Sequence, residues 1–317
     1  MNYILVFFNK ANKIFPIFFL CLLLIIISVN VPAQEKGGGR IEVRVELVNV
    51  LCTVVDKKGN FITNLTKDDF IIYEDGKPQK ILNFSARTDI PLSIALLIDT
   101  SASVAKKLKF EQEAAADFFY TVLRSQDQAM LVEFDSGVTL VQDFTNDPNL
   151  FEKQLKTLRA AGGTSLYDAI YLVSEEKFLY NEGEKRKTFI IISDGEDTVS
   201  KSTFDEALEM AQRVGATIFA ISTNKGGYFG VKGSEEGDVI LEQLASATGG
   251  RVFYPRHMKD LGVAFKKINL ELRSQYSLSY KPTNQKRDGS FRSIKVRVRQ
   301  KGLKVRCRKG YFAPKGD

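Results

Sequence analysis

The fold of this chain is indicated by the stretch Ser93-Ile94-Ala95-Leu96-Leu97-Ile98-Asp99-Thr100-Ser101-Ala102-Ser103. Its first six residues are mostly apolar and do not alternate with polar ones, which is typical of a strand covered on both faces of a parallel sheet. A second run of this kind extends from Thr188 to Ile192 and is followed by Ser193 and Asp194. Both runs end in short polar residues, so we expect oxygen-bearing side chains where these strands end.

Outward from this stretch, strands and helices alternate along the chain. We expect strands at 92–99, 128–134, 137–143, 187–193, 216–222 and 251–254, and helices at 108–124, 147–159, 167–180, 203–214, 238–248 and 258–273. This alternation predicts an α/β domain over residues 90–275, with a doubly wound, mostly parallel, Rossmann-like sheet and one antiparallel edge hairpin.

Segments rich in β-strands flank the predicted α/β domain. Residues 34–89 contain a long strand at 41–52, a strand at 70–73 and, after the turn Asp75-Gly76, a returning strand at 79–85. Residues 276–317 contain strands at 276–280, 291–299 and 303–308. Each set has too few strands to form a stable sandwich. We therefore expect one hairpin from each end of the chain to combine into a small β-sandwich beside the α/β domain.

The N-terminal 33 residues have the layout of a secretory signal peptide. Lys10 and Lys13 precede an apolar run at 14–27, and Val31-Pro32-Ala33 follows it. The alternative is an uncleaved membrane anchor, which would be the only part of the chain in contact with a membrane. Either interpretation predicts an exported protein that is periplasmic, on the cell surface or secreted.

Two cysteines remain once such a signal peptide, which contains Cys21, is removed. Cys52 and Cys307 lie near opposite ends of the mature chain. In an oxidising compartment they would form a disulfide, and otherwise they are two buried free thiols. Neither has the CxxC spacing of a zinc or redox site.

The positive formal charge of +7 is concentrated near the C-terminus. Residues 281–309 contain twelve Lys or Arg and one acidic residue, Asp288. Such a surface suits polyanions. Basic residues alternate with valines in Lys295-Val296-Arg297-Val298-Arg299, so we interpret them first as the solvent-facing side of a half-buried strand. No nucleic acid partner is expected.

Three loops of the predicted α/β domain carry oxygen donors suited to a hard cation. Open α/β sheets bind ligands outside the carboxyl ends of their strands, and Mg²⁺ takes six oxygen ligands. Each segment alone also fits a helix cap or a turn. Together they predict one site for Mg²⁺, or for Mn²⁺ or Ca²⁺, formed by Asp99, Ser101, Ser103, Thr164 and Asp194. The two aspartates give this site a formal charge of −2, and without a third carboxylate the cation keeps a position open for an external one.

These three segments resemble the metal-ion-dependent adhesion site (MIDAS) of the von Willebrand factor type A domain, in order and in element. The resemblance covers about residues 90–275, while the segments at 65–70, 74–76 and 308–311 are similar to an exported bacterial subgroup of such proteins. It implies that the serines and the threonine reach the metal, that the aspartates often act through water, and that Asp or Glu of a protein partner completes the coordination. An acidic glycan is a second candidate partner, and a glycine-rich loop at 226–237 with Tyr228 and Phe229 is a candidate contact.

Enzymatic function is not expected from this sequence. The sole histidine, His257, is distant in sequence from Ser101, and there is no GxSxG, GxxxxGK[ST] or GxGxxG motif. Phosphotransfer on Asp99 would, by comparison with enzymes of that kind, need a second aspartate at position 101. The alternatives to a binding module are a structural envelope protein whose metal only supports folding, and a polyanion binder that uses residues 281–309.

Overall fold

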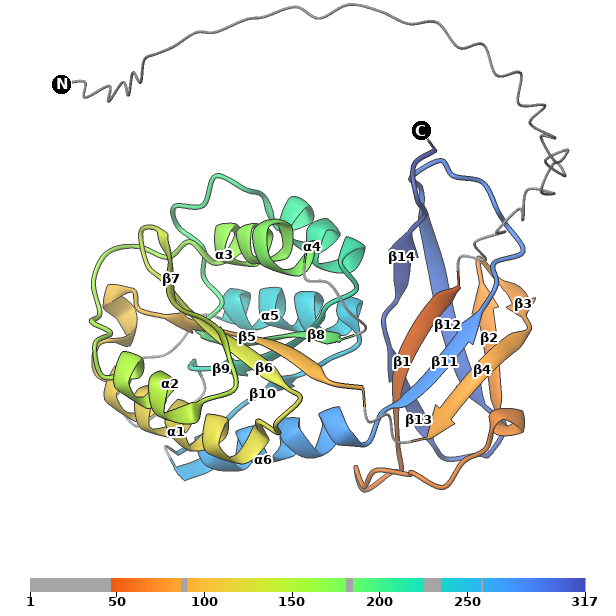
Figure 1. Ribbon diagram of the computed structural model, residues 1–317, viewed down its shortest axis with the longest axis horizontal. Coiled ribbons are helices and arrows are strands. Elements are labelled where there is room, and N and C mark those ends of the chain that lie inside the picture. The colour runs from red at the N-terminus through yellow and green to blue at the C-terminus, as the bar shows by residue number, and fades with distance from the viewer. Residues whose placement is uncertain (1–46, 87–89, 181–184, 225–234, 258, 317) are drawn as a thin grey trace, which may run out of the picture. The chain divides into compact units, whose positions relative to one another are not determined.

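The computed structural model describes residues 47–86, 90–180, 185–224, 235–257 and 259–316 (Figure 1). The predicted signal segment at 1–33 lies outside the described residues, and so do Tyr228 and Phe229 of the glycine-rich loop. None of the helices in the described ranges combines the length and the apolar character needed to cross a membrane.

A six-stranded sheet forms the centre of the α/β domain, with the strand order β10-β9-β8-β5-β6-β7. The strands are β5 (Leu92–Asp99), β6 (Gln128–Phe134), β7 (Val138–Thr145), β8 (Arg186–Ser193), β9 (Thr217–Ser222) and β10 (Val252–Phe253). All neighbours are parallel except β6 and β7, which form the antiparallel edge hairpin. The predicted α/β fold class is confirmed, because β5 and β9 are buried along their whole length as strands covered on both faces should be.

Helices cover both faces of this sheet (Figure 1). They are α1 (Leu108–Val122), α2 (Pro148–Leu155), α3 (Leu166–Leu172), α4 (Phe204–Arg213), α5 (Glu235–Thr248) and α6 (Lys259–Arg273). One apolar cluster joins the sheet to α1, α2 and α6, and includes the stacked rings of Phe119 and Phe151. A second cluster joins the opposite face to α3, α4 and α5. Two separate cores therefore hold the sheet in place.

Two helices are shorter than the sequence predicted. The helix expected at 147–159 begins where Asp147 accepts a hydrogen bond from the Asn149 backbone, but it ends at Leu155, and the chain continues in tight turns. The helix expected at 167–180 changes after Leu172 into a π-helical turn, Val173–Phe178. There the Leu179 N–H bonds to the Ser174 carbonyl five residues back, a wider turn than the α-helical pattern anticipates.

Strands from both ends of the chain build the β-sandwich, as predicted. One sheet has the order β13-β1-β11-β4 and the other β14-β12-β2-β3. The strands are β1 (Val48–Val55), β2 (Phe70–Glu74), β3 (Lys77–Gln79), β4 (Ile81–Ala86), β11 (Tyr276–Tyr280), β12 (Phe291–Val298), β13 (Lys304–Cys307) and β14 (Gly310–Phe312). Their inward side chains form a third core between the two sheets.

The expected pair of simple hairpins is wrong in detail. The segment predicted as one returning strand divides at Lys80: β3 pairs with β2, whereas β4 crosses to the other sheet and pairs with β11. At the C-terminal end, β12 pairs with β2 and β14, while β13 pairs with β1. Local alternation gives each strand its inward face, but the partner of a strand depends on contacts that are distant in the sequence.

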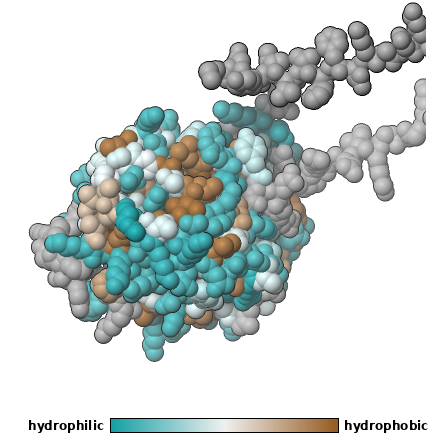
Figure 2. Space-filling view, turned by 60° about the vertical axis from the view of Figure 1, so that its left-hand side comes forward, coloured by the Kyte–Doolittle hydropathy of each residue, from teal (hydrophilic) through white to brown (hydrophobic). Residues whose placement is uncertain are grey.

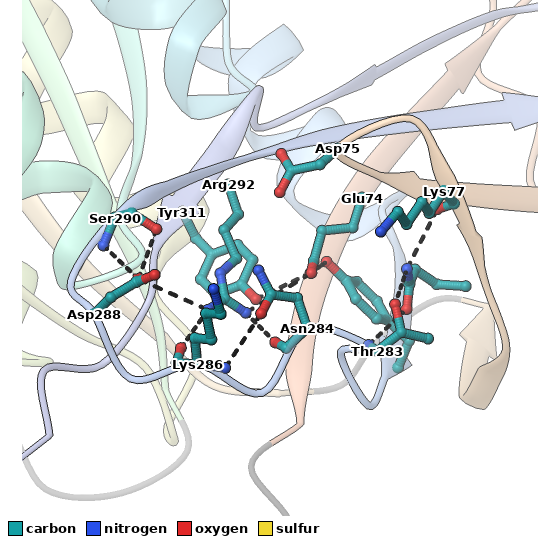
Figure 3. Close-up of polar contacts among 12 residues, drawn as sticks. Glu74, Asp75, Lys77, Thr283, Asn284, Lys286, Asp288, Ser290, Arg292 and Tyr311 are labelled. Atoms are coloured by element: carbon teal, nitrogen blue, oxygen red, sulfur yellow. Dashed lines mark hydrogen bonds and ion pairs between the residues drawn. The ribbon is translucent and has the colours of Figure 1, made fainter.

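A buried polar network fixes the long connection between β11 and β12 (Figure 3). Glu74, 1% exposed, accepts hydrogen bonds from the hydroxyls of Tyr280 at 2.7 Å and Tyr311 at 3.0 Å. Arg292 lies 3.9 Å from Glu74 and donates to the carbonyl oxygens of Asn284 and Lys286. One acidic and one basic side chain are thus buried together, and each makes two hydrogen bonds.

The basic residues of β12 are mainly surface residues. Lys295 and Arg297 are exposed and alternate with the buried Ile294 and Val296, so the predicted solvent-facing side of a half-buried strand is confirmed there. Arg292 is the exception because it points inward. Figure 2 shows another view of the surface, on which hydrophilic residues predominate and apolar patches lie between them.

Candidate metal site

The candidate site lies where the order of the sheet reverses. After β5 the chain adds β6 on one side and later β8 on the other, so the carboxyl ends of β5 and β8 flank the switch point of the sheet. Asp99 is the last residue of β5 and Ser193 the last of β8. The sheet topology therefore brings the first and last predicted metal-site segments to the same edge of the sheet.

Asp99 is buried and hydrogen-bonded at this edge of the sheet. Its carboxylate is fully buried and accepts hydrogen bonds from the Ser101 backbone at 2.9 Å and the Ser193 hydroxyl at 2.7 Å. Burial raises the pKa of Asp99 to about 6, although the hydrogen bonds from Ser101 and Ser193 oppose this and the nearby Asp194 charge adds to it. No ion pair from a basic side chain to Asp99 or Asp194 exists in the described part of the chain.

The two serines and Asp194 form a continuous chain of hydrogen bonds. The hydroxyls of Ser101 and Ser103 are 3.0 Å apart, and the Ser103 hydroxyl donates to Asp194 Oδ2 at 3.0 Å. Ser101 is 2% exposed, whereas Ser103 is open to solvent. Four of the five predicted residues are therefore linked: Asp99 through the Ser101 backbone, and Ser101, Ser103 and Asp194 through their side chains.

Backbone hydrogen bonds join the segment just before Thr164 to the loop that carries Ser101 and Ser103. The Ala102 N–H donates to the Gly162 carbonyl at 3.2 Å, and the Ala161 N–H donates to the Thr100 carbonyl at 2.8 Å. Thr164 itself is 5% exposed, and its N–H donates to the Thr198 hydroxyl at 2.9 Å. Among the described residues its own hydroxyl makes no hydrogen bond with the other four. The five-residue metal set remains a prediction, with Thr164 placed beside it by the backbone.

The loop that carries Asp194 is positioned by close backbone packing. Gly195 has a φ of +80°, and a Cβ there would lie 2.2 Å from the carbonyl oxygen of Gly237 in α5. Asn224 donates its side-chain amide to the Asp194 carbonyl at 2.6 Å. Only glycine combines this φ with this contact, so Gly195 fixes the position of Asp194.

One acidic residue near the site was not anticipated from the sequence. Glu111 of α1 is 1% exposed, and neither of its carboxylate oxygens has a hydrogen-bond partner in the described structure. Burial raises the pKa of Glu111 to about 8, and the charges of Asp99 and Asp194 contribute to this, while Lys107 acts against it. The sequence did contain a signal, because Glu111 replaces an apolar residue in the inward stripe of α1.

The chemistry of these residues fits a hard divalent cation. Hydroxyl and carboxylate oxygens are the donors that Mg²⁺, Mn²⁺ and Ca²⁺ prefer, and the buried Asp99 carboxylate lacks a compensating positive charge. Over the described ranges, no group of three or more His, Cys, Asp or Glu side chains is arranged to ligate a metal. A cation here would therefore depend on Ser101, Ser103 and Thr164 as well as on the carboxylates.

Other acidic and basic groups considered from the sequence have different surroundings. The carboxylate of Asp168 accepts hydrogen bonds from the backbones of Lys201 at 3.0 Å and Ser202 at 2.8 Å, so it holds the segment that precedes α4. His257 is exposed just before α6, and its backbone N–H donates to the carboxylate of Asp260.

Comparison with known proteins identifies the α/β part of the chain. Residues 94–196 match the family model of the von Willebrand factor type A domain. No curated protein matches the chain. The solved von Willebrand factor type A structure from Catenulispora acidiphila is similar at 14% identity and a TM-score of 0.51, and the match covers 78% of this chain and 74% of that one.

Two further solved structures are similar to a smaller part of the chain. BatB, a conserved hypothetical protein from Bacteroides thetaiotaomicron, matches at 16% identity and a TM-score of 0.47, over 57% of this chain and 97% of its own. Proximal thread matrix protein 1 from the mussel byssus, solved with a zinc-occupied MIDAS motif, matches at 20% identity and a TM-score of 0.48, over 58% of this chain and 48% of its own.

Proposed function

We propose that this chain is a non-enzymatic binding protein that binds an acidic group of a partner through one divalent cation. The match of residues 94–196 to the von Willebrand factor type A family model supports this proposal. Ser101, Ser103 and Thr164 would supply neutral oxygens, and Asp99 and Asp194 the compensating charge. When bound, the cation supplies a Lewis-acidic position for an Asp or Glu of a protein partner. An acidic glycan is the second candidate ligand.

One observation carries this proposal. The hydroxyls of Ser101 and Ser103 and the carboxylate of Asp194 are joined at 3.0 Å contacts, from segments 91 residues apart, above a buried Asp99 without a cationic neighbour in the described residues. A group of oxygens with this much buried negative charge attracts a hard cation, preferably Mg²⁺ or Mn²⁺. The same proposal places the protein outside the cytoplasm, because the N-terminal 33 residues have the pattern of an export signal.

Metal uptake is the first test of the proposal. Isothermal titration of the purified full-length chain with MnCl₂ should show one site, which Asp99→Ala should abolish. Asp117→Ala is the matched control, since Asp117 is an exposed aspartate on α1, and it should bind Mn²⁺ like the wild type. A wild-type chain that takes up neither Mn²⁺ nor Mg²⁺ would refute the proposal.

Capture of an acidic group is the second test. Binding of the chain to a polyglutamate-coated sensor should require Mg²⁺, disappear with EDTA and be absent in Asp99→Ala. Binding that survives EDTA and weakens steeply with salt would instead favour the polyanion binder that uses residues 281–309. A metal that binds and raises the melting temperature without permitting capture would favour the structural envelope protein.

A further inference from the structure

Glu111 occupies a place where helix α1 otherwise buries apolar side chains. The inward stripe of α1 consists of Leu108, Ala115, Phe118, Phe119 and Val122, all at most 6% exposed. Glu111, at 1% exposure, lies one turn after Leu108 on this same stripe. An acidic side chain is thus directed into the interior near the carboxyl end of the sheet, where an apolar residue would pack without electrostatic cost.

The protein leaves this carboxylate unsatisfied. Both of its oxygens are buried, and neither has a hydrogen-bond partner in the part of the chain that the structure describes. Lys107 precedes Glu111 by one turn, but its ammonium group donates to the Thr223 carbonyl at 2.5 Å. Buried carboxylates in proteins are nearly always hydrogen-bonded, paired or bound to a cation, so the missing partner is itself informative.

The place of Glu111 in the fold indicates the missing partner. Helix α1 begins at Leu108, shortly after the loop that carries Ser101 and Ser103, so Glu111 lies in its first turn at the same end of the sheet as Asp99. Both carboxylates are buried, and the charge of Asp99 contributes to the raised pKa of Glu111. A divalent cation bound next to Asp99 would offset the repulsion between these two groups.

We propose that Glu111 is a further residue of the cation site, whose carboxylate adds a third negative charge and accepts hydrogen bonds from water bound to the ion. This inference rests on the proposed function, and it alters the charge count made from the sequence, which included only Asp99 and Asp194. The third charge increases the affinity for the ion. It also weakens the attraction between the ion and the carboxylate of a partner.

Isosteric removal of the charge tests this role. Mn²⁺ titration of Glu111→Gln should give a dissociation constant roughly tenfold above that of the wild type, the usual effect of removing a group that supports metal ligands. The matched control is Glu113→Gln, an exposed glutamate on the same helix, which should leave the affinity unchanged. Glu111→Ala provides a second variant that suits the apolar stripe and should weaken Mn²⁺ binding in the same direction.

The outcomes separate this inference from the proposed function. If the wild type and Glu111→Gln bind Mn²⁺ equally well while Asp99→Ala does not bind, the inference about Glu111 is wrong and the metal site stands. If the wild type binds no metal, both are wrong. At saturating Mg²⁺, Glu111→Gln should hold polyglutamate at least as tightly as the wild type, whereas a merely misfolded variant would lose capture.

Discussion

Replacing Glu111 by glutamine should stabilise the metal-free protein, and the gain should grow with pH. The pKa of Glu111 rises from an ordinary 4.5 to about 8 on folding, chiefly through burial. An acid whose folded pKa is raised contributes stability below its unfolded pKa, and this contribution is lost as the pH rises through the folded pKa. For Glu111 the loss begins near pH 4.5 and is complete above pH 8. Glutamine does not ionise, so the variant avoids the loss.

The size of the effect follows from the shift in pKa. The difference between 8 and 4.5 corresponds to about 5 kcal/mol of unfolding free energy at high pH, at 1.36 kcal/mol per pKa unit. Structural relaxation around the charge reduces this, so we expect a gain of about 2 to 5 kcal/mol for Glu111→Gln at pH 9 relative to pH 4.5. In a protein of this size each kcal/mol moves the melting temperature by about 2 to 4 °C.

Urea unfolding of both proteins in EDTA, at intervals from pH 4.5 to pH 9, measures this difference directly. The two stability curves should separate as the pH rises, while Glu113→Gln should follow the wild type. Asp99 also has a raised pKa, and because it is present in every variant its own titration contributes to each stability curve. Curves for Glu111→Gln and wild type that stay parallel across the whole range would refute the reasoning. Saturating Mg²⁺ should reduce the difference in unfolding free energy between the two proteins. The wild type keeps the carboxylate of Glu111 and therefore gains more stability from the ion than Glu111→Gln does.

Two further predictions concern the junction of the domains and the sandwich. Glu271 of α6 is fully buried and forms ion pairs with Arg306 of β13 and with Arg251, which is 2.9 Å away. Because Glu271→Gln would leave the two arginines without their carboxylate, it should lower the unfolding free energy by about 3 kcal/mol. An unchanged midpoint of urea unfolding would contradict this. Cys52 and Cys307 are free but stand directly opposite each other on β1 and β13. Oxidised glutathione should therefore convert the two thiols to a disulfide, and the intact mass should fall by two hydrogen atoms. If both cysteines can still be alkylated when the treated protein is unfolded, no disulfide has formed and the prediction is wrong.

The strands and helices of the α/β domain were the most predictable parts of this chain. Strand β5 has the predicted bounds because an unbroken apolar run has few alternatives to a buried strand. The loop after it was recognisable because Asp99, Ser101 and Ser103 stand together in sequence. By contrast, the division of the segment at Lys80 between two sheets could not be predicted, since the partners of β3 and β4 lie far apart along the chain.

Glu111 shows a different limit of sequence reasoning. A glutamate on an amphipathic helix is ordinarily interpreted as a solvent-exposed residue, and the helix was recognised from the apolar residues around it. Its burial becomes apparent only when the stripe formed by Leu108, Ala115 and Phe118 is followed turn by turn. The bounds of α2 and the π-helical turn after α3 were missed because they depend on single hydrogen bonds.

The pairing of β1 with β11 has a mechanical consequence. The two strands are antiparallel, with Val48 opposite Tyr280 and Cys52 opposite Tyr276, and the α/β domain connects to β11 at the Tyr276 end. Tension applied between the start of β1 and Asp99 would pull the two strands lengthwise past each other. All five residue pairs of this ladder would then resist together, in shear, instead of opening one after another as in a peeled hairpin.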